Sequence, residues 1–212
     1  MRSTLFTKNH WAIILCGGRG SRLGSVSETL PKSLIRVHGK PLLWYTVLML
    51  YKNGFRKFIF PLGYKGEMIE SFLTQEFDER DIEIRLVDTG IDTPIANRLH
   101  KVSKLIPEGD DFFLLNGDTF FDFNISEMYQ IHKRKNALLT LSSVEIISPY
   151  GILVEEDGMI TDFTRDEQIS YFSLNGKHDK KGYVNSGFSW INKDALNLLD
   201  LEACQSFEQE LY

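Results

Sequence analysis

The feature that most constrains this chain is an apolar run that ends abruptly in glycines close to its start. The run covers residues 12–16, Gly17, Gly18 and Gly20 follow it, and Arg22 comes two residues later. A buried strand that ends in glycines lets the backbone approach a ligand and aim its N–H groups at negative oxygens. We therefore expect a phosphate-binding loop directly after a buried strand.

Positive charge gathers near this loop, although the whole chain has a net charge of −5. Arg22 follows the glycines, and Lys32 stands behind Pro31 at the end of a polar loop. A local cationic segment in an acidic protein suits a small anionic ligand, whereas nucleic-acid binding requires a basic face. The sequence thus predicts a nucleoside triphosphate as ligand and no nucleic acid as partner.

The spacing of these residues argues against two common phosphate-binding loops. A dinucleotide fingerprint that starts at Gly18 requires a third glycine where Leu23 stands. A P-loop requires a glycine directly before the Lys-Ser pair, where this chain has Pro31. A NAD-dependent dehydrogenase also fails because the five histidines form no cluster. A glycine-rich surface turn is the remaining alternative, and the two spaced cations make it the weaker one.

The rest of the chain alternates between strand and helix patterns. Helices are expected over residues 41–52, 67–74 and 94–106, and strands over 57–62, 82–87 and 112–115. Repeated strand–helix units of this length predict a mostly parallel, Rossmann-like sheet flanked by helices. From residue 137 the pattern is rich in strands, with a hairpin turn at 156–158, so an antiparallel region is expected there. The predicted fold class is α/β, with a single domain over residues 11–212.

Length and composition place further bounds on the protein. No apolar run approaches the roughly 20 residues that span a bilayer, so no membrane segment is predicted. Residues 1–10 lack the apolar core of a signal peptide and are expected to form a flexible tail. Cys16 lies in a predicted buried strand, so a disulfide with Cys204 is not expected and a cytoplasmic location is predicted.

Asp118 is the first candidate for chemistry. It follows a short apolar strand and the pair Asn116-Gly117, at the edge where open α/β sheets place ligands. A carboxylate there can hold Mg²⁺, and nucleotidyl transfer requires a hard cation to neutralise phosphate charge. A plain Gly-Asp turn is the structural alternative, and the glycine loop upstream weakens it.

The motif G-G-x-G-x-R-L at residues 17–23, followed by Pro31-Lys32, resembles the sugar-phosphate nucleotidyltransferase family. The resemblance covers nearly the whole chain and implies an enzyme that joins a sugar 1-phosphate to a nucleoside triphosphate and releases pyrophosphate. It implies that Arg22 grips the leaving phosphates and that Lys32 bridges the α-phosphate and the sugar phosphate. Asp118, the third catalytic residue, matches the metal-binding position of the family.

The same resemblance implies which residues contact each substrate. Residues 11–135 would form the nucleotide-binding part of the domain and residues 136–212 the sugar-binding part. The expected nucleotide-binding residues are Leu15, Gly17, Gly18, Gly20, Ser21, Arg22, Asn97, Asn116 and Gly117. The expected sugar-binding residues are Tyr150, Gly151, Arg165 and Asn185.

Different segments resemble enzymes with different bases. Residues 86–90 (Leu-Val-Asp-Thr-Gly) and 97–102 look most like glucose-1-phosphate cytidylyltransferase, whereas residues 115–122 are similar to guanylyltransferases for heptose or mannose 1-phosphates. We therefore expect CTP, with GTP as the alternative. A catalytically silent nucleotide- or sugar-binding domain is a further alternative, because residues 163–167 and 185–187 depart from the sugar-binding pattern of the family.

The family usually supplies a second metal-binding aspartate beyond the point that matches Tyr212. A C-terminally truncated chain would explain its absence, and Asp122 is a candidate substitute, although a plain loop acid is the simpler interpretation. The sequence does not fix the oligomeric state, and its Phe and Tyr content is compatible with a homo-oligomer.

Overall fold

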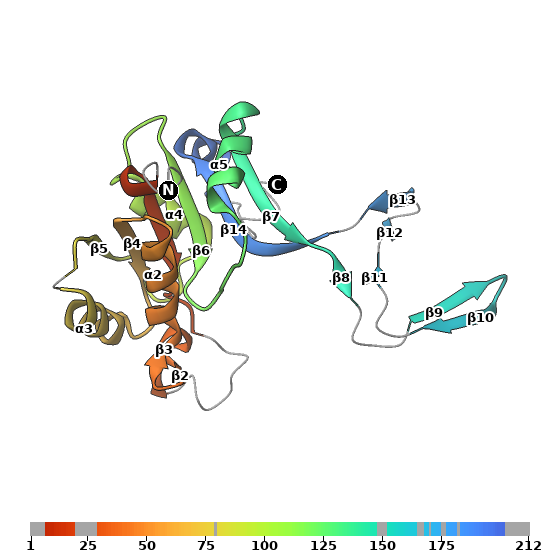
Figure 1. Cartoon of the computed structure of the whole chain (residues 1–212), viewed down its shortest axis with the longest axis horizontal. Coiled ribbons are helices and arrows are strands. Elements are labelled where there is room, and N and C mark those ends of the chain that lie inside the picture. Colours follow the sequence, from red (N-terminus) through yellow and green to blue (C-terminus); the bar gives the residue numbers. More distant parts are fainter. Residues whose placement is uncertain are drawn as a thin grey trace. The chain divides into compact units, whose positions relative to one another are not determined.

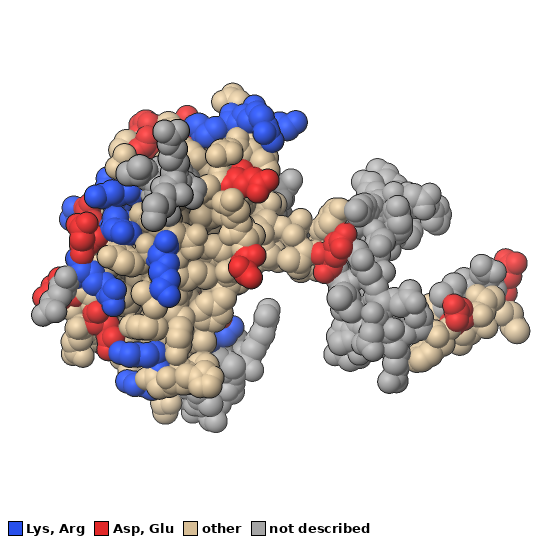
Figure 2. Space-filling model, in the orientation of Figure 1, with Lys and Arg blue, Asp and Glu red and all other residues tan. Residues whose placement is uncertain are grey.

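The computed structural model describes residues 7–19, 29–78, 80–147, 152–164, 168–169, 171–174, 177–181 and 183–201. The chain divides into two compact units. The first contains the described residues up to Thr140 and again from Gly187, and the second runs from Leu141 to Ser186. On the face shown in Figure 2, basic and acidic side chains of the first unit are interspersed.

The central sheet has six strands in the order β5-β4-β1-β6-β14-β7 (Figure 1). Its strands are β1 (Trp11–Leu15), β4 (Lys57–Leu62), β5 (Glu83–Asp88), β6 (Asp111–Asn116), β7 (Leu139–Val144) and β14 (Val184–Asn192). Strand β1 pairs in parallel with β4 and β6, β4 pairs in parallel with β5, and β14 is antiparallel to β6. The mostly parallel sheet confirms the predicted α/β fold class.

Helices cover both faces of this sheet: α2 (Leu42–Lys52), α3 (Gly66–Phe77), α4 (Ile95–Ser103) and α5 (Ile125–Arg134) (Figure 1). Alternate residues of β1 enter different clusters of the core, because successive side chains of a strand point to opposite faces. Ala12 and Ile14 pack with buried residues of α2 and α3, whereas Trp11 and Ile13 pack with those of α4. The β1 run is therefore apolar throughout because both faces of the sheet are covered.

Local signals explain where the helices begin and end. Helix α2 starts directly after Pro41, whose φ of −59° suits a helix start, and stops before Gly54, which has a φ of 94°. The side chain of Asn124 caps α5 by accepting hydrogen bonds from the backbone N–H groups of Ser126 and Glu127. The three helices expected before residue 107 are present, with ends that differ from the prediction by a few residues.

Residues 7–10, which the sequence predicts to belong to a flexible tail, pack against other residues of the first unit. Thr7, in the short helix η1 (Thr7–Asn9), is buried, and its hydroxyl donates to the carbonyl of Asn53 at 2.8 Å. The Nε2 atom of His10 lies 2.8 Å from the hydroxyl of Tyr129. These polar contacts attach the segment, a role that its lack of apolar periodicity does not reveal. The remaining tail, residues 1–6, lies outside the described residues.

The second unit contains the expected antiparallel strands. They are β8 (Ile146–Ile147), β9 (Ile152–Glu156), β10 (Met159–Thr164), β11 (Gln168–Ile169), β12 (Tyr171–Leu174) and β13 (Lys177–Lys181). Strand β9 pairs with β10, β8 with β11, and β12 with β13, each antiparallel. The expected hairpin turn is present at Asp157-Gly158, where both residues have positive φ angles. Among the described residues, no helix has both the length and the apolar composition to cross a bilayer.

The division of the chain into two units differs in one respect from the expected division into residues 11–135 and 136–212. The first border, at residues 140/141, falls close to the expected one after residue 135. Residues 187–201, however, return to the first unit, where the last strand packs its Phe188 and Trp190 into the core. Residues 187–201 therefore belong with the first unit and not with the strand-rich second unit.

Candidate active site

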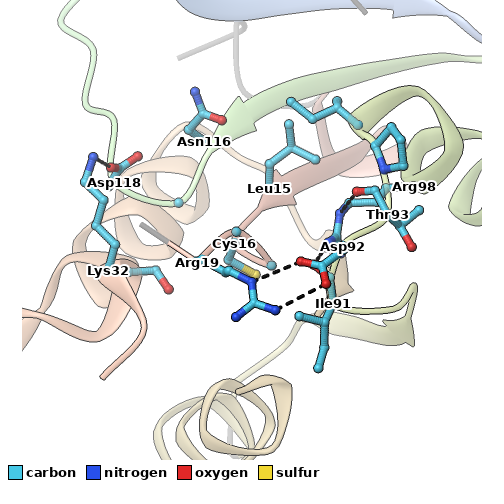
Figure 3. Close-up of a pocket in the computed structure, with 16 residues that line it drawn as sticks. Leu15, Cys16, Arg19, Lys32, Ile91, Asp92, Thr93, Arg98, Asn116 and Asp118 are labelled. Carbon is cyan, nitrogen blue, oxygen red and sulfur yellow. Dashed lines mark hydrogen bonds and ion pairs between the residues drawn. The ribbon is translucent and has the colours of Figure 1, made fainter. Parts of the chain in front are cut away.

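A cavity of about 540 Å³ lies in the first unit at the carboxyl ends of β1 and β6 (Figure 3). It is lined by residues 15–19, 32–33, 91–95, 98 and 116–118. The chain runs from β1 to β4 and β5 on one side and then crosses to β6 on the other. Open α/β sheets bind ligands at such a switch point, outside the carboxyl ends of the strands.

Gly17 and Gly18 are glycines for different reasons. A Cβ at Gly17 would lie 2.9 Å from the carbonyl oxygen of Pro61 and 3.0 Å from the backbone nitrogen of Gly63, so packing excludes any side chain. The carbonyl of Gly17 also accepts a hydrogen bond from the backbone N–H of Tyr64 at 3.1 Å. At Gly18, among the described residues and apart from its chain neighbours, a Cβ would meet no atom within 4 Å. Gly17 therefore holds the loop in place, while Gly18 leaves open space at the cavity.

Lys32 and Asp118 form an ion pair at the cavity (Figure 3). Lys32 begins the short helix η3 (Lys32–Leu34), and its side chain is 49% exposed, whereas that of Asp118 is 19% exposed. The turn before Asp118 is fixed from both sides. Its Gly117 donates a backbone hydrogen bond to Leu15 at 2.9 Å and accepts one from the hydroxyl of Thr46 at 3.3 Å. Two of the three predicted catalytic residues thus meet in one place.

Arg98 holds one wall of the cavity. The sequence alone predicts no role for it. The residue is 6% exposed, and its guanidinium donates to the carbonyls of Leu62, Ile91 and Thr93 and to the hydroxyl of Thr89, at 2.5–3.1 Å. Burial lowers the pKa of Arg98, because desolvation disfavours the charged form, and the nearby Asp88 and Asp92 act in the opposite direction. The guanidinium therefore fixes the loop between β5 and α4, from which several lining residues come.

One signal in the sequence pointed to Arg98. Ala96, Leu99 and Val102 form the buried side of α4, and Arg98 is the basic residue that shares this side. Arginine is rarely buried unless its donors are satisfied, so an arginine in a buried stripe indicates a hydrogen-bonding role.

A second ion pair connects the glycine loop to the same wall. The Nε and Nη2 atoms of Arg19 lie 3.0 and 3.2 Å from the two carboxylate oxygens of Asp92 (Figure 3). The hydrogen bond from Arg19 lowers the pKa of Asp92. Both side chains are largely exposed, at 56% and 77%, so solvent weakens the pair.

Cys16 also lines the cavity, but its thiol is not activated. The side chain is buried, and burial raises the pKa of the thiol to about 12. Because the thiolate is the reactive form, a thiol with this pKa does not act as a nucleophile near neutral pH. The chemistry of this cavity is therefore that of charge and hydrogen bonding.

The structure brings together many of the residues that the sequence singled out. Among the predicted nucleotide-binding and catalytic residues, those that line the cavity are Leu15, Gly17, Gly18, Lys32, Asn116, Gly117 and Asp118. Outside the described residues lie the nucleotide-binding candidates Gly20, Ser21 and Arg22 and the sugar-binding candidates Tyr150, Gly151 and Arg165.

Three further residues lie elsewhere. The side-chain amide of Asn97 donates to the carbonyl of Leu201 at 3.3 Å, and the residue is not part of the cavity lining. Asn185 is exposed, on the part of β14 that belongs to the second unit. Asp122, the candidate second metal ligand, is exposed and does not line the cavity. Within the described ranges, no group of three or more His, Cys, Asp or Glu residues could hold a metal ion.

Known proteins that are similar to this chain are nucleotidyltransferases. The model of the family described as nucleotidyl transferase matches residues 11–211. The chain is 31% identical to the probable glucose-1-phosphate cytidylyltransferase of Bacillus subtilis, over 94% of this chain and 81% of that protein. It is also 31% identical to the D-glycero-alpha-D-manno-heptose 1-phosphate guanylyltransferase of Aneurinibacillus thermoaerophilus, over 94% of this chain and 82% of that protein.

A solved structure shares the fold. HddC from Yersinia pseudotuberculosis, complexed with GMP-PN, superimposes with a TM-score of 0.64 at 23% identity. The superposition covers 90% of this chain and 80% of that one.

Proposed function

Because the chain belongs to the nucleotidyl transferase family, we propose that it transfers the nucleotidyl group of CTP to a sugar 1-phosphate and releases pyrophosphate. The observation that carries this proposal is the pairing of Lys32 with Asp118 at a cavity whose rim is the glycine loop. A cation beside a carboxylate, next to open backbone at Gly18, suits a ligand with a phosphate chain.

The reaction requires little covalent help from the protein. A phosphate oxygen of the sugar 1-phosphate attacks the α-phosphorus in line, the bond to the β-phosphate breaks, and pyrophosphate leaves with the bonding electrons. Catalysis of such a step consists mainly of positioning and charge stabilisation. Lys32 would neutralise the phosphate at which the new bond forms, and Arg22, which is outside the described residues, would bind the leaving phosphates.

Asp118 suits Mg²⁺ only together with the nucleotide. Mg²⁺ keeps several waters and is commonly bound by one or two carboxylates plus the phosphates of a substrate. Two carboxylates line the cavity: Asp92, which pairs with Arg19, and Asp118, which follows β6 and fits this mode. When bound, the ion supplies neutralisation of the phosphate charge.

GTP is the alternative donor. One relative named as a probable cytidylyltransferase and one named as a guanylyltransferase match this chain at the same 31% identity. The Val-Asp-Thr-Gly segment at residues 87–90 favours CTP, because it resembles cytidylyltransferases. It lies directly before the cavity wall of residues 91–95, where a base would be read. The sugar is proposed to bind through Tyr150, Gly151, Arg165 and Asn185.

The test is pyrophosphate release with Mg²⁺ across CTP, GTP, UTP, ATP and dTTP, each offered with a panel of hexose and heptose 1-phosphates. We expect turnover with CTP and one sugar phosphate, and loss of turnover in Asp118→Asn. Asp78→Asn is the matched control, because Asp78 is exposed and outside the cavity lining. Turnover with GTP and not with CTP would show that GTP is the nucleotide donor. Binding of a nucleotide without any release of pyrophosphate would contradict the proposed enzymatic activity. It would favour a catalytically silent binding domain.

A further inference from the structure

Ser33 is a buried serine whose hydroxyl is without a hydrogen-bond partner in the part of the chain that the structure describes. The residue is 4% exposed, lines the cavity and directly follows Lys32 in η3. A buried hydroxyl that makes no hydrogen bond is unfavourable and is uncommon in folded proteins. Its presence at a cavity wall therefore calls for a physical reason.

Other buried hydroxyls of the first unit are satisfied. Thr7 donates to Asn53 at 2.8 Å, and Ser103 donates to the carbonyl of His100 at 2.9 Å. Thr89 donates to a carbonyl of β4 at 2.6 Å and also accepts from Arg98. The fold thus finds partners for hydroxyls in its core, and Ser33 differs from them in lining the cavity.

The backbone around Ser33 is already committed to a turn. Leu34 donates to the carbonyl of Pro31 at 2.9 Å, and Ile35 donates to the carbonyl of Lys32 at 3.1 Å. This fixed turn holds the Ser33 hydroxyl one residue away from the cation that pairs with Asp118. The hydroxyl therefore lies beside the cation of Lys32, and among the described residues it has no hydrogen-bond partner.

We propose that Ser33 is a phosphate-binding residue, whose hydroxyl donates a hydrogen bond to an oxygen of the phosphate chain that Lys32 neutralises. This inference rests on the proposed function. A phosphate oxygen is a charged acceptor, and hydrogen bonds to charged acceptors are stronger than those between neutral groups. When Lys32 turns from Asp118 to the phosphate, the hydroxyl gains access to the same ligand.

The experiment compares the wild-type protein with Ser33→Ala by titration calorimetry. The probes are CTP and GTP with Mg²⁺, inorganic tripolyphosphate, and the nucleosides cytidine and guanosine. We expect Ser33→Ala to bind the better nucleotide and tripolyphosphate roughly 10- to 100-fold more weakly, as for a hydrogen bond to a charged group. Nucleoside binding should not change, because a nucleoside has no phosphate.

Thermal unfolding separates this role from a structural one. Removing an unpaired hydroxyl should leave the melting temperature unchanged or raise it, so a loss of affinity cannot be explained by a loss of stability. Ser103→Ala is the matched control, since it removes a buried serine hydroxyl that is hydrogen-bonded and outside the cavity lining. We expect it to lower the melting temperature and to leave tripolyphosphate binding unchanged.

Equal tripolyphosphate affinity in wild type and Ser33→Ala would overturn the inference while leaving the proposed function intact. A wild-type protein that binds neither tripolyphosphate nor any nucleotide would overturn both. Should Ser33→Ala not fold, Ser33→Cys serves in its place, because a thiol is a weak donor of similar size and should show a smaller loss of affinity.

Discussion

The guanidinium of Arg98 lies so close to Gly17 that a Cβ on the glycine would stand 2.7 Å from Nη1. The same nitrogen lies 2.6 Å from the position of a Cβ on Gly63. A buried cation of α4 and two glycines thus occupy one small space between the glycine loop and the wall of residues 91–95. The shape of the cavity depends on this contact.

Gly17→Ala should therefore destabilise the protein, by about 1–3 kcal/mol as for an overpacked site. The new methyl group would meet backbone atoms of Pro61 and Gly63, which cannot rotate away. Urea unfolding measures the change. Gly18→Ala is the control, because its methyl group would meet no atom of the described residues beyond its chain neighbours, and its free energy of unfolding should stay close to that of the wild type. Equal stability of the two variants would contradict the packing described here.

Arg98→Lys should lower the free energy of unfolding by at least about 1–3 kcal/mol, the cost of a buried polar group left unpaired. A lysine ammonium is a compact charge and cannot reach acceptors spread along a loop as a planar guanidinium does. Urea unfolding again gives the measurement. Arg85→Lys, which alters an exposed pair with Glu83, should change stability by less than about 0.5 kcal/mol.

Lys32→Met should reduce the rate of pyrophosphate release roughly 10²- to 10³-fold, as for the loss of one group that stabilises transition-state charge. The half-exposed pair with Asp118 contributes less than about 1 kcal/mol to folding, so the variant should unfold at nearly the wild-type urea concentration. Lys135→Met, at an exposed lysine outside the cavity lining, should retain full activity. A fully active Lys32→Met would remove Lys32 from the mechanism.

Acid should destabilise the protein through Asp111. Burial alone would raise the pKa of this carboxyl, but hydrogen bonds with His132, Lys133 and Asn192 outweigh burial and hold the pKa well below its usual range. The stability that such a group contributes is present above its unfolded pKa of about 3.9 and is lost as the pH falls toward the folded pKa.

Urea unfolding between about pH 7 and about pH 3, on either side of the unfolded pKa, tests this prediction. The difference in stability between wild type and Asp111→Asn should shrink below about pH 4. Asp78→Asn, at an exposed aspartate, controls for the removal of one negative charge. A difference that stays constant across the whole range would show that Asp111 does not carry the acid sensitivity.

The local pattern of the chain was sufficient to predict β1, α2 and β6. Their apolar periods follow directly from burial on one or both faces, and the glycines after β1 indicate the cavity edge. The sequence also predicts Lys32 and Asp118 as site residues. It does not predict their ion pair, because a contact between distant segments depends on the strand order. The order in which β6 returns beside β1 is a property of the whole sheet.

Two residues of α4 show where sequence reasoning stops. Asn97 was expected at the nucleotide, yet it bonds to Leu201, while its neighbour Arg98 faces the cavity. Successive residues of a helix point about 100° apart, so a motif match that is right about the segment does not decide which side chain faces a ligand. The role proposed for Ser33 could not be predicted for another reason, because an unpaired hydroxyl is visible only once its surroundings are known.

The position of the cavity between β1 and β6 has a consequence for the way the protein assembles. In a partly folded chain that has paired only β1, β4 and β5, the glycine loop and the wall of residues 91–95 are in place. Asn116, Gly117 and Asp118 are not yet at the cavity, because they follow β6 or end it. A ligand that needs all three segments therefore binds only after β6 has joined the sheet. By mass action it stabilises the completed sheet alone and shifts every partly assembled form toward it.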